Sequence, residues 1–192
     1  MSFHKTCKNN STRVNQGDIF KNISFIEKYT EIAGEFEIKI LDFPYVYILT
    51  QDCDLEQNKN ERNKIDQNLC SKRDKYLISV LAAPIYNAQH VFEGNHLSNI
   101  EIDSEKCNSD RKKKIKKNQE QRYHYIEFAS DIELSSSIID FKHYFSITLE
   151  SLEENMNKRI CQIEPLYRES ISQRFSYYLS RIGLPNIEKC EE

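Results

Sequence analysis

The first half of the chain contains two patterns of apolar residues that are typical of β-strands. Residues 36–40 (FEIKI) alternate between apolar and polar side chains, which predicts a strand with one face exposed. Residues 45–50 (YVYILT) are almost continuously apolar, which is typical of a strand buried on both faces. Residues 42–44 should form a break between the two. Four later apolar runs predict further strands: 76–83, 123–128, 138–141 and 144–149. Pro84 should end the first of these four.

The C-terminal part of the chain follows a helical period instead. Pro165 is typical of a first helical turn, and Gly183 and Pro185 are typical of a helix end. Six apolar residues recur at helical spacing on one face: Tyr167, Ile171, Phe175, Tyr178, Leu179 and Ile182. Residues 55–75 are polar and predict a solvated helix or a long loop. These patterns predict an α+β fold: a small, bent antiparallel β-sheet or an SH3-like barrel, with helical insertions and a packed C-terminal helix.

The chain has 192 residues, which is enough for one hydrophobic core. Residues 1–15 are polar, and we expect them to form a flexible N-terminus. Residues 16–192 should form a single α+β domain. A polar insertion that ends in a basic run is expected at about 97–121.

Composition and charge limit which cellular compartment and which kinds of binding partner we expect for this protein. The net charge of −3 excludes a globally basic nucleic-acid-binding protein. The apolar runs are too short to cross a bilayer, and the N-terminus has no apolar signal core. The six cysteines are scattered without a CxxC pair, which favours reduced thiols. We therefore expect a cytoplasmic protein with no membrane contact.

The sequence after residue 49, Thr50-Gln51-Asp52-Cys53-Asp54, carries the strongest chemical signal. If the strand continues through it, Asp52 and Asp54 share one face and Cys53 lies buried behind them. Two adjacent carboxylates suit acid–base catalysis or a divalent cation such as magnesium. In the alternative interpretation the strand stops at Thr50, and both aspartates are turn residues that bond to the backbone.

Several other residues could complete such a site. From the C-terminal helix, Arg168 or Arg174 could supply a cation to the carboxylates, and Gln173 lies in mid-helix beside Arg174. His90 or His96 could act as a base for a Cys53 nucleophile. A second candidate is a basic run that could bind nucleic-acid phosphates: Arg111, Lys112, Lys113, Lys114, Lys116 and Lys117. The alternative for this run is a solvated loop or helix tip.

Three segments together resemble an uncharacterised bacterial family whose genes lie near mobile or defence loci. They are residues 16–20 (QGDIF), residues 46–55 (VYILTQDCDL) and the C-terminal pattern YRE, SQRF and RIGLP within residues 167–185. Residues 17–19 (GDI) and the strand ending at Thr50 also resemble the PemK/MazF-like toxins, which are SH3-like barrels that cleave RNA. The basic Arg-Pro element of those toxins is replaced by Asp42-Phe43-Pro44-Tyr45, so the second resemblance favours a barrel rather than RNA cleavage.

Two classes of function follow from these observations. The first is an accessory or binding component of a bacterial defence or toxin–antitoxin-like system, which contacts a partner protein or nucleic acid. The second is an enzyme, namely a metal-dependent nuclease or another phosphodiester-cleaving protein that uses Asp52 and Asp54. A flat apolar surface patch would favour the binding component, and converging carboxylates in a pocket would favour the enzyme.

Overall fold

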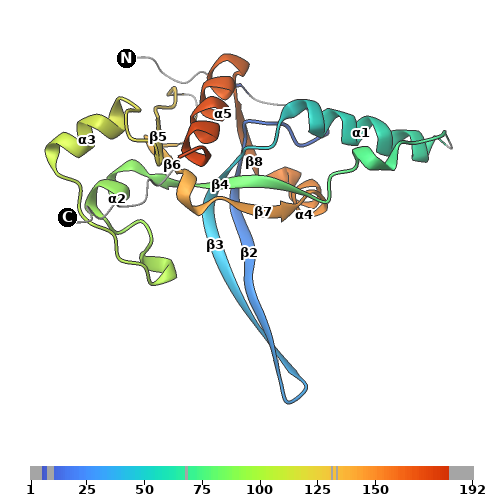
Figure 1. The fold of residues 1–192 in the computed structure, drawn as a ribbon, viewed down its shortest axis with the longest axis horizontal. Helices are drawn as coiled ribbons and strands as arrows, with labels where there is room; N and C mark the ends of the chain where they lie inside the picture. Colours follow the sequence, from blue (N-terminus) through green and yellow to red (C-terminus); the bar gives the residue numbers. More distant parts are fainter. Residues whose placement is uncertain (1–5, 8–10, 68, 131, 133, 182–192) are drawn as a thin grey trace, which may run out of the picture.

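A computed structural model describes residues 6–7, 11–67, 69–130, 132 and 134–181. Its centre is a curled, antiparallel, half-barrel sheet (Figure 1). The strands are β1 (Thr6–Cys7), β2 (Asp18–Ile32), β3 (Glu35–Ile48), β4 (Ser79–Asn87), β5 (Tyr123–Ile126), β6 (Ser137–Asp140), β7 (Phe145–Thr148) and β8 (Arg159–Ile163). They follow the order β1-β8-β2-β3-β4-β6-β5, and β7 also pairs with β4. The expected α+β class with a bent antiparallel sheet is confirmed.

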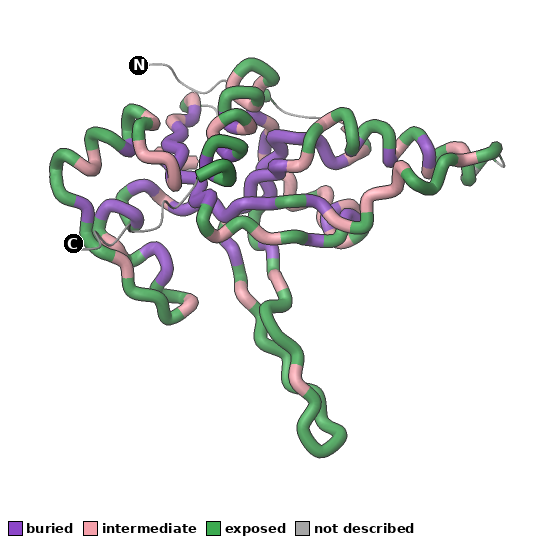
Figure 2. Tube along the Cα trace, viewed as in Figure 1, coloured by how far each residue is buried: buried purple, intermediate pink, exposed green. Residues whose placement is uncertain are grey.

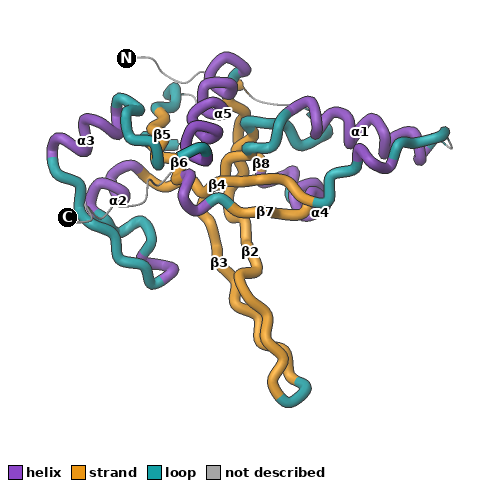
Figure 3. Tube along the Cα trace, viewed as in Figure 1, coloured by secondary structure: helices purple, strands orange, loops and turns teal. Residues whose placement is uncertain are grey.

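The described residues form five α-helices around this sheet (Figure 3). They are α1 (Asp52–Asp66), α2 (Ala88–Glu93), α3 (Ser109–Lys116), α4 (Leu149–Glu154) and α5 (Pro165–Leu179). The described residues also form four short 3-10 turns between these elements: η1 (Arg73–Lys75), η2 (Ser98–Ile100), η3 (Phe141–His143) and η4 (Met156–Lys158). The polar segment at 55–75 is therefore mostly helix, as one of its two interpretations predicted.

Two hydrophobic clusters lie on opposite faces of the central strand β3. Tyr47 points into the cluster that Ile171 and Phe175 of α5 cover. Its neighbours Val46 and Ile48 point into a second cluster that includes helix residues of α1 and α4. Because alternate residues of a strand face opposite sides, one apolar run supplies both cores. The packed C-terminal helix is confirmed.

Strand β4 begins and ends later than the predicted strand at 76–83, because it covers Ser79–Asn87. It continues through Pro84, which pairs with Val46 of β3. On its other edge β4 pairs with β7 at residues 79–82 and with β6 at residues 85–87. Pro84 therefore lies where β4 passes from one partner to the other, so its missing N–H breaks no ladder there. The prediction that Pro84 ends the strand was wrong. Strand β8 (RICQI) was not predicted, because it is short and begins with a charge.

The insertion at about 97–121 is more than a solvated loop. Leu97, Cys107 and Ile115 are buried in a third hydrophobic cluster with residues of α2, β5 and β6. The N-terminal segment also makes defined contacts, since β1 pairs with β8 and Val14 is buried. Most of the residues expected to be flexible, 1–5 and 8–10, lie outside the described part of the chain.

Strands β2 and β3 extend far beyond the sheet as a two-stranded arm, here defined as residues 24–42 (Figures 1 and 2). β8 pairs with β2 only at residues 18–20, and β4 pairs with β3 only at residues 45–48. The hairpin turn has positive φ at both central residues, Ala33 (54°) and Gly34 (86°), as a type I′ turn requires. The break predicted at 42–44 does not occur, because β3 runs through it.

Candidate functional site

The segment 50–54 lies where β3 ends and α1 begins, so it does not continue the strand. Thr50 Oγ1 accepts a hydrogen bond from the N–H of Leu81 (2.7 Å), and the Gln51 carbonyl accepts the N–H groups of Asp54 and Leu55 (3.2 Å each). Asp52, Cys53 and Asp54 occupy successive positions in the first helical turn. Residues on a helix diverge by about 100° per position, so the two carboxylates do not share one face. The strand-based prediction was therefore wrong.

Burial separates these side chains further. Cys53 and Asp54 are exposed, and the Cys53 thiol donates a hydrogen bond to the Asp54 carboxylate (3.7 Å). The prediction of a buried Cys53 was wrong, because the buried face of α1 is formed by Leu55, Asn58 and Glu61 instead. Acidic residues at a helix N-terminus also complement its positive end.

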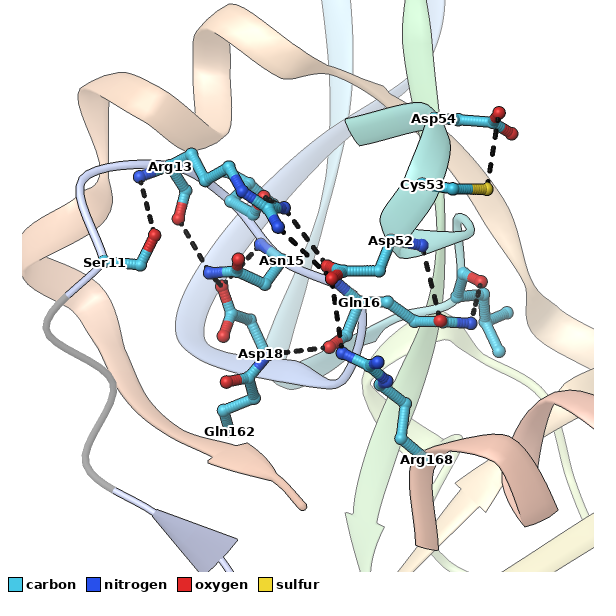
Figure 4. A network of polar contacts seen from close by, with 12 residues as sticks. Ser11, Arg13, Asn15, Gln16, Asp18, Asp52, Cys53, Asp54, Gln162 and Arg168 are labelled. Carbon is cyan, nitrogen blue, oxygen red and sulfur yellow. Dashed lines mark hydrogen bonds and ion pairs between the residues drawn. The ribbon is translucent and has the colours of Figure 1, made fainter. Parts of the chain in front are cut away.

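Asp52 alone of the two aspartates is drawn into the protein, where it meets two arginines (Figure 4). Its carboxylate accepts hydrogen bonds from both terminal nitrogens of Arg13 (3.1 and 3.2 Å) and from the backbone N–H of Gln16 (3.1 Å). Arg168 of α5 approaches the same carboxylate at 3.5 Å. Partial burial by itself would raise the pKa of Asp52, but the Arg13 hydrogen bonds and the charges outweigh it and lower the pKa. Of the two arginines named from the sequence, Arg168 therefore faces Asp52, whereas Arg13, which was not named, makes the shorter contact.

A second ion pair lies next to Asp52 and was missed from sequence. Asp18, fully buried, is paired with Arg159 (3.2 Å) and accepts the N–H of Asn15 (2.8 Å). Arg159 also donates to the carbonyls of Arg13 (3.0 Å) and Ser11 (2.6 Å). We refer to Arg13, Gln16, Asp18, Asp52, Arg159 and Arg168 as the Asp52 network. The Gln16-Gly17-Asp18 turn was the sequence signal that could have identified it.

Gly17 lets this turn approach α5. Its φ is +84°, and a Cβ at this position would lie 3.1 Å from Cδ of Arg168. The N–H of Gly17 donates a hydrogen bond to the carbonyl of Ile48 (3.0 Å), and the carbonyl of Gly17 accepts one from the N–H of Ile163 (2.9 Å). The turn thus joins β2, β3 and β8 beside the helix that carries Arg168.

The other predicted residues of α5 lie elsewhere. Arg174 donates to the carbonyls of Asn118, Glu120 (2.8 Å) and Tyr123 (2.9 Å), so it holds α5 to the α3–β5 segment. Burial lowers the pKa of Arg174. Gln173 is exposed. Leu179 was predicted on the apolar face but is 50% exposed. Ile182, Gly183 and Pro185 lie outside the described residues.

The basic run forms α3 and the residue that follows it. Arg111 is not free, because it makes a bidentate pair with Glu120 (2.7 and 3.0 Å). Lys112 and Lys116 lie over the ring of Phe92 (5.7 Å each). Four lysines are exposed: Lys113, Lys114, Lys116 and Lys117. These four lysines remain candidates for phosphate contact.

A third polar centre, also missed from sequence, surrounds Asp140 at the end of β6. The Asp140 carboxylate accepts two nitrogens of Arg122 (2.6 and 2.8 Å) and approaches Nδ1 of His143 (2.9 Å). Burial opposes its ionisation, but hydrogen bonds from Arg122 and His143 prevail and lower its pKa to about 2. Nε2 of the buried His96 lies 4.0 Å from this carboxylate, and burial lowers the pKa of His96 to about 4.

This placement separates the histidines from Cys53. His96 packs against the rings of Tyr86 and Tyr123, and His90 is on α2. Helices α1 and α2 lie on opposite sides of the sheet in Figure 1. A dyad of Cys53 with His90 or His96 is therefore not present.

The most unusual surface of the molecule is on the arm. Register places five large apolar side chains on one face, here called the apolar arm face: Ile26, Tyr29, Phe36, Ile38 and Ile40. They are 53–68% exposed. Figure 2 shows the outer part of the arm as almost entirely exposed. The alternation of residues 36–40 had predicted one polar and one apolar face, but it could not show that the apolar face is uncovered.

Within the described part of the chain, no group of three or more His, Cys, Asp or Glu side chains is arranged to hold a metal ion. None of the described helices has the length and apolar character of a membrane span. A scan against protein-family models and a search of curated proteins found no match to this chain.

Proposed function

We propose that this chain is a protein-binding module that holds a partner protein on the apolar arm face. The observation that carries the proposal is the exposure of five large apolar side chains on one side of a two-stranded ribbon. Contiguous apolar patches on soluble proteins mark interaction sites. Covering these side chains would remove roughly 600 Å² from solvent, which approaches the share of one partner in a standard interface.

The shape of the arm supports the same conclusion. A two-stranded hairpin is only marginally stable alone in water, and this one has no third strand along residues 24–42 in the described structure. The bulge between Ile26 and Lys28 interrupts the ladder further. A partner on the apolar face would stabilise the arm as well as gain binding energy from it.

Charge defines the chemistry of that partner. Five carboxylates and two lysines lie between residues 24 and 42, so the arm has a net charge of −3. Lys39 is also paired with Glu27 (2.7 Å). A partner surface that is apolar at its centre and rimmed by Lys or Arg complements this arrangement, whereas a nucleic acid would be repelled.

Catalysis at Asp52 and Asp54 has less support. Two arginines already face Asp52, and they oppose the entry of a metal cation. Asp54 projects to solvent without a second carboxylate beside it. The resemblance of residues 16–20, 46–55 and 167–185 to a family near defence loci supports a partner within a bacterial defence or toxin–antitoxin-like system.

The test begins with a photo-crosslinking amino acid at position 36, on the apolar arm face, and at position 30, on the opposite face. Each variant is expressed in cells of the source organism, and the cross-linked protein is identified by mass spectrometry. We expect cross-links from position 36 only. The partner is then purified, and its affinity for the full chain is measured by calorimetry.

Two double variants separate the faces of the arm. Phe36→Ser with Ile38→Ser should weaken binding by about 30-fold or more, because the loss of even one hot-spot side chain costs about 2 kcal/mol or more. Lys28→Ser with Thr30→Ser, the matched control on the opposite face, should change affinity by less than about threefold. If light scattering shows a stable dimer that the first pair dissociates, the occupant is a second copy of this chain. Tight binding of an RNA or DNA on the arm would also overturn the proposal.

A further inference from the structure

A cavity of about 480 Å³ lies at the root of the arm. Residues 42–45 of β3 form one wall, the end of β4 forms another, and residues 95–100 after α2 form the third. A volume of this size accommodates a large side chain or a small ligand. The Asp52 network and the polar centre around Asp140 supply no ionised side chain to its lining.

The cavity is continuous with the apolar arm face. Residues 36, 38, 40 and 42 alternate without a bulge on β3, so Asp42 lies on the same face as Ile40. Ser24, opposite Asp42 on β2, donates its hydroxyl to Oδ1 of that carboxylate (2.6 Å). Oδ2 of Asp42 has no hydrogen-bond partner in the described structure. A partner chain that covers the arm would therefore meet this free oxygen where the cavity opens.

The formally charged side chain that lines the cavity is negative. Asp42 is the cavity's one carboxylate, and no lysine or arginine lines it. Its remaining polar side chains are three asparagines, one serine, two histidines and two tyrosines. His96 is held neutral at pH 7 by burial, which lowers its pKa to about 4. The electrostatics of the lining therefore favour a cationic occupant.

The shape of the lining favours a planar cation with several donors. The rings of Tyr45 and Tyr86 both line the cavity, and stacking on tyrosine favours a guanidinium. Residues with acceptor side chains are spread over several positions, since Asn95 and Asn99 line the cavity together with Asp42. An ammonium is a compact point charge, whereas a guanidinium has five donors in a fork.

We propose that this cavity receives an arginine side chain of the partner protein as the anchor of its basic rim. The inference rests on the proposed function, since it assigns the partner group that docks beside the apolar arm face. The guanidinium would donate to Oδ2 of Asp42 and stack on tyrosine, while the aliphatic stem packs along Phe43 and Pro44. Arginine is enriched among residues that dominate interface energies.

The first test uses a peptide probe and does not require the partner. The full chain, labelled with ¹⁵N, is titrated with acetyl-Ile-Arg-Ile-amide and with the same peptide containing citrulline, the neutral isostere of arginine. We expect amide shifts at residues 42–45, 85–87 and 95–100, with a Kd of about 1 mM, as an isolated anchor should give. Citrulline should bind about fivefold or more weakly, because it keeps the shape but removes the charge.

A matched pair of variants identifies the carboxylate. Asp42→Asn should reduce the affinity of the arginine peptide by about fivefold, whereas Asp54→Asn, an exposed aspartate on α1, should leave it unchanged. Equal binding of the citrulline peptide, or shifts that map outside the cavity, would overturn the inference. An unchanged affinity in Asp42→Asn would do the same.

Once the partner is purified, its binding separates the two proposals. If Phe36→Ser with Ile38→Ser abolishes partner binding but Asp42→Asn does not weaken it, the arm function stands and the arginine anchor is wrong. If neither change affects partner binding, the proposed function itself is wrong. We expect both changes to weaken it, with Asp42→Asn reducing affinity about fivefold.

Discussion

The Asp52 network and the apolar arm face differ in how completely their groups are satisfied within the chain. In the network, the carboxylates of Asp52 and Asp18 are matched by arginines and backbone N–H groups. On the arm, side chains that resemble an ordinary strand remain 53–68% exposed. Groups that find partners inside the fold stabilise it, whereas groups without partners are available for binding. The arm is therefore the better candidate for function.

The largest expected effect concerns the buried pair in the network. Arg159→Met should destabilise the protein by about 3–5 kcal/mol, because Asp18 would remain buried without its counter-charge. Urea unfolding at pH 7 measures the change. The double variant Arg159→Met with Asp18→Asn is the control, since it removes both charges and should recover part of the loss. A single variant within about 1 kcal/mol of the original chain would show that the pair is not structural.

A pair of identical substitutions compares the core with the arm directly. Phe175 of α5 is 7% exposed, whereas Phe36 of the arm is 66% exposed. Phe175→Ala should cost about 3–4 kcal/mol, because it leaves a cavity beside Phe141. Phe36→Ala should change the free energy of unfolding by about 0.5 kcal/mol or less. A comparable loss in both would mean that the arm belongs to the cooperative core, and the comparison would fail.

Acid should weaken the interior but not the arm. The folded-state pKa of His96, about 4, lies below its ordinary value of 6.5, so the unfolded chain binds the proton first as the pH falls. Stability should therefore be complete above pH 6.5 and decline towards pH 4, by about 1–2 kcal/mol between pH 7 and pH 5. Asp140, with a pKa of about 2, should add a further loss between about pH 4 and pH 2.

Unfolding measured at pH 7 and pH 5 tests this titration. His96→Leu should flatten the decline between these two values, because the buried imidazole is removed. The free energy of unfolding of His96→Leu at pH 7 measures any loss of packing beside Tyr86, so this loss can be separated from the pH dependence. An equally steep decline in His96→Leu would assign the titration to another group.

The smallest effects separate the two aspartates of α1. Asp52→Asn should cost about 1 kcal/mol, since its ion pair with Arg13 is partly exposed to solvent. Asp54→Asn should be neutral within about 0.5 kcal/mol because the side chain projects to solvent. Differential scanning calorimetry of both variants checks this order. Equal losses of stability in the two variants would contradict this order, because Asp54 would then stabilise the fold as much as Asp52 does.

The sequence by itself determined the elements with a strong period. Continuous apolar residues at 45–48 specify a central strand, because such a run can be satisfied only between two cores. Pro165 and the Ile171–Phe175–Tyr178 spacing specify a packed helix for the same kind of reason. The α+β class followed from these local patterns.

Tertiary structure decided what the polar residues do. Whether Asp52 continues a strand or begins a helix depends on Arg13, Gln16 and Arg168, which meet it from segments far away in the chain. Pro84 is tolerated because β4 changes partners there, and Asp18 is paired because β8 brings Arg159 beside it. Whether residues 36–40 would be covered also depends on the ends of β4 and β8. Which residues form ion pairs, which strands are neighbours and which side chains are covered all depend on segments far apart in the chain. No local periodicity could therefore have revealed them.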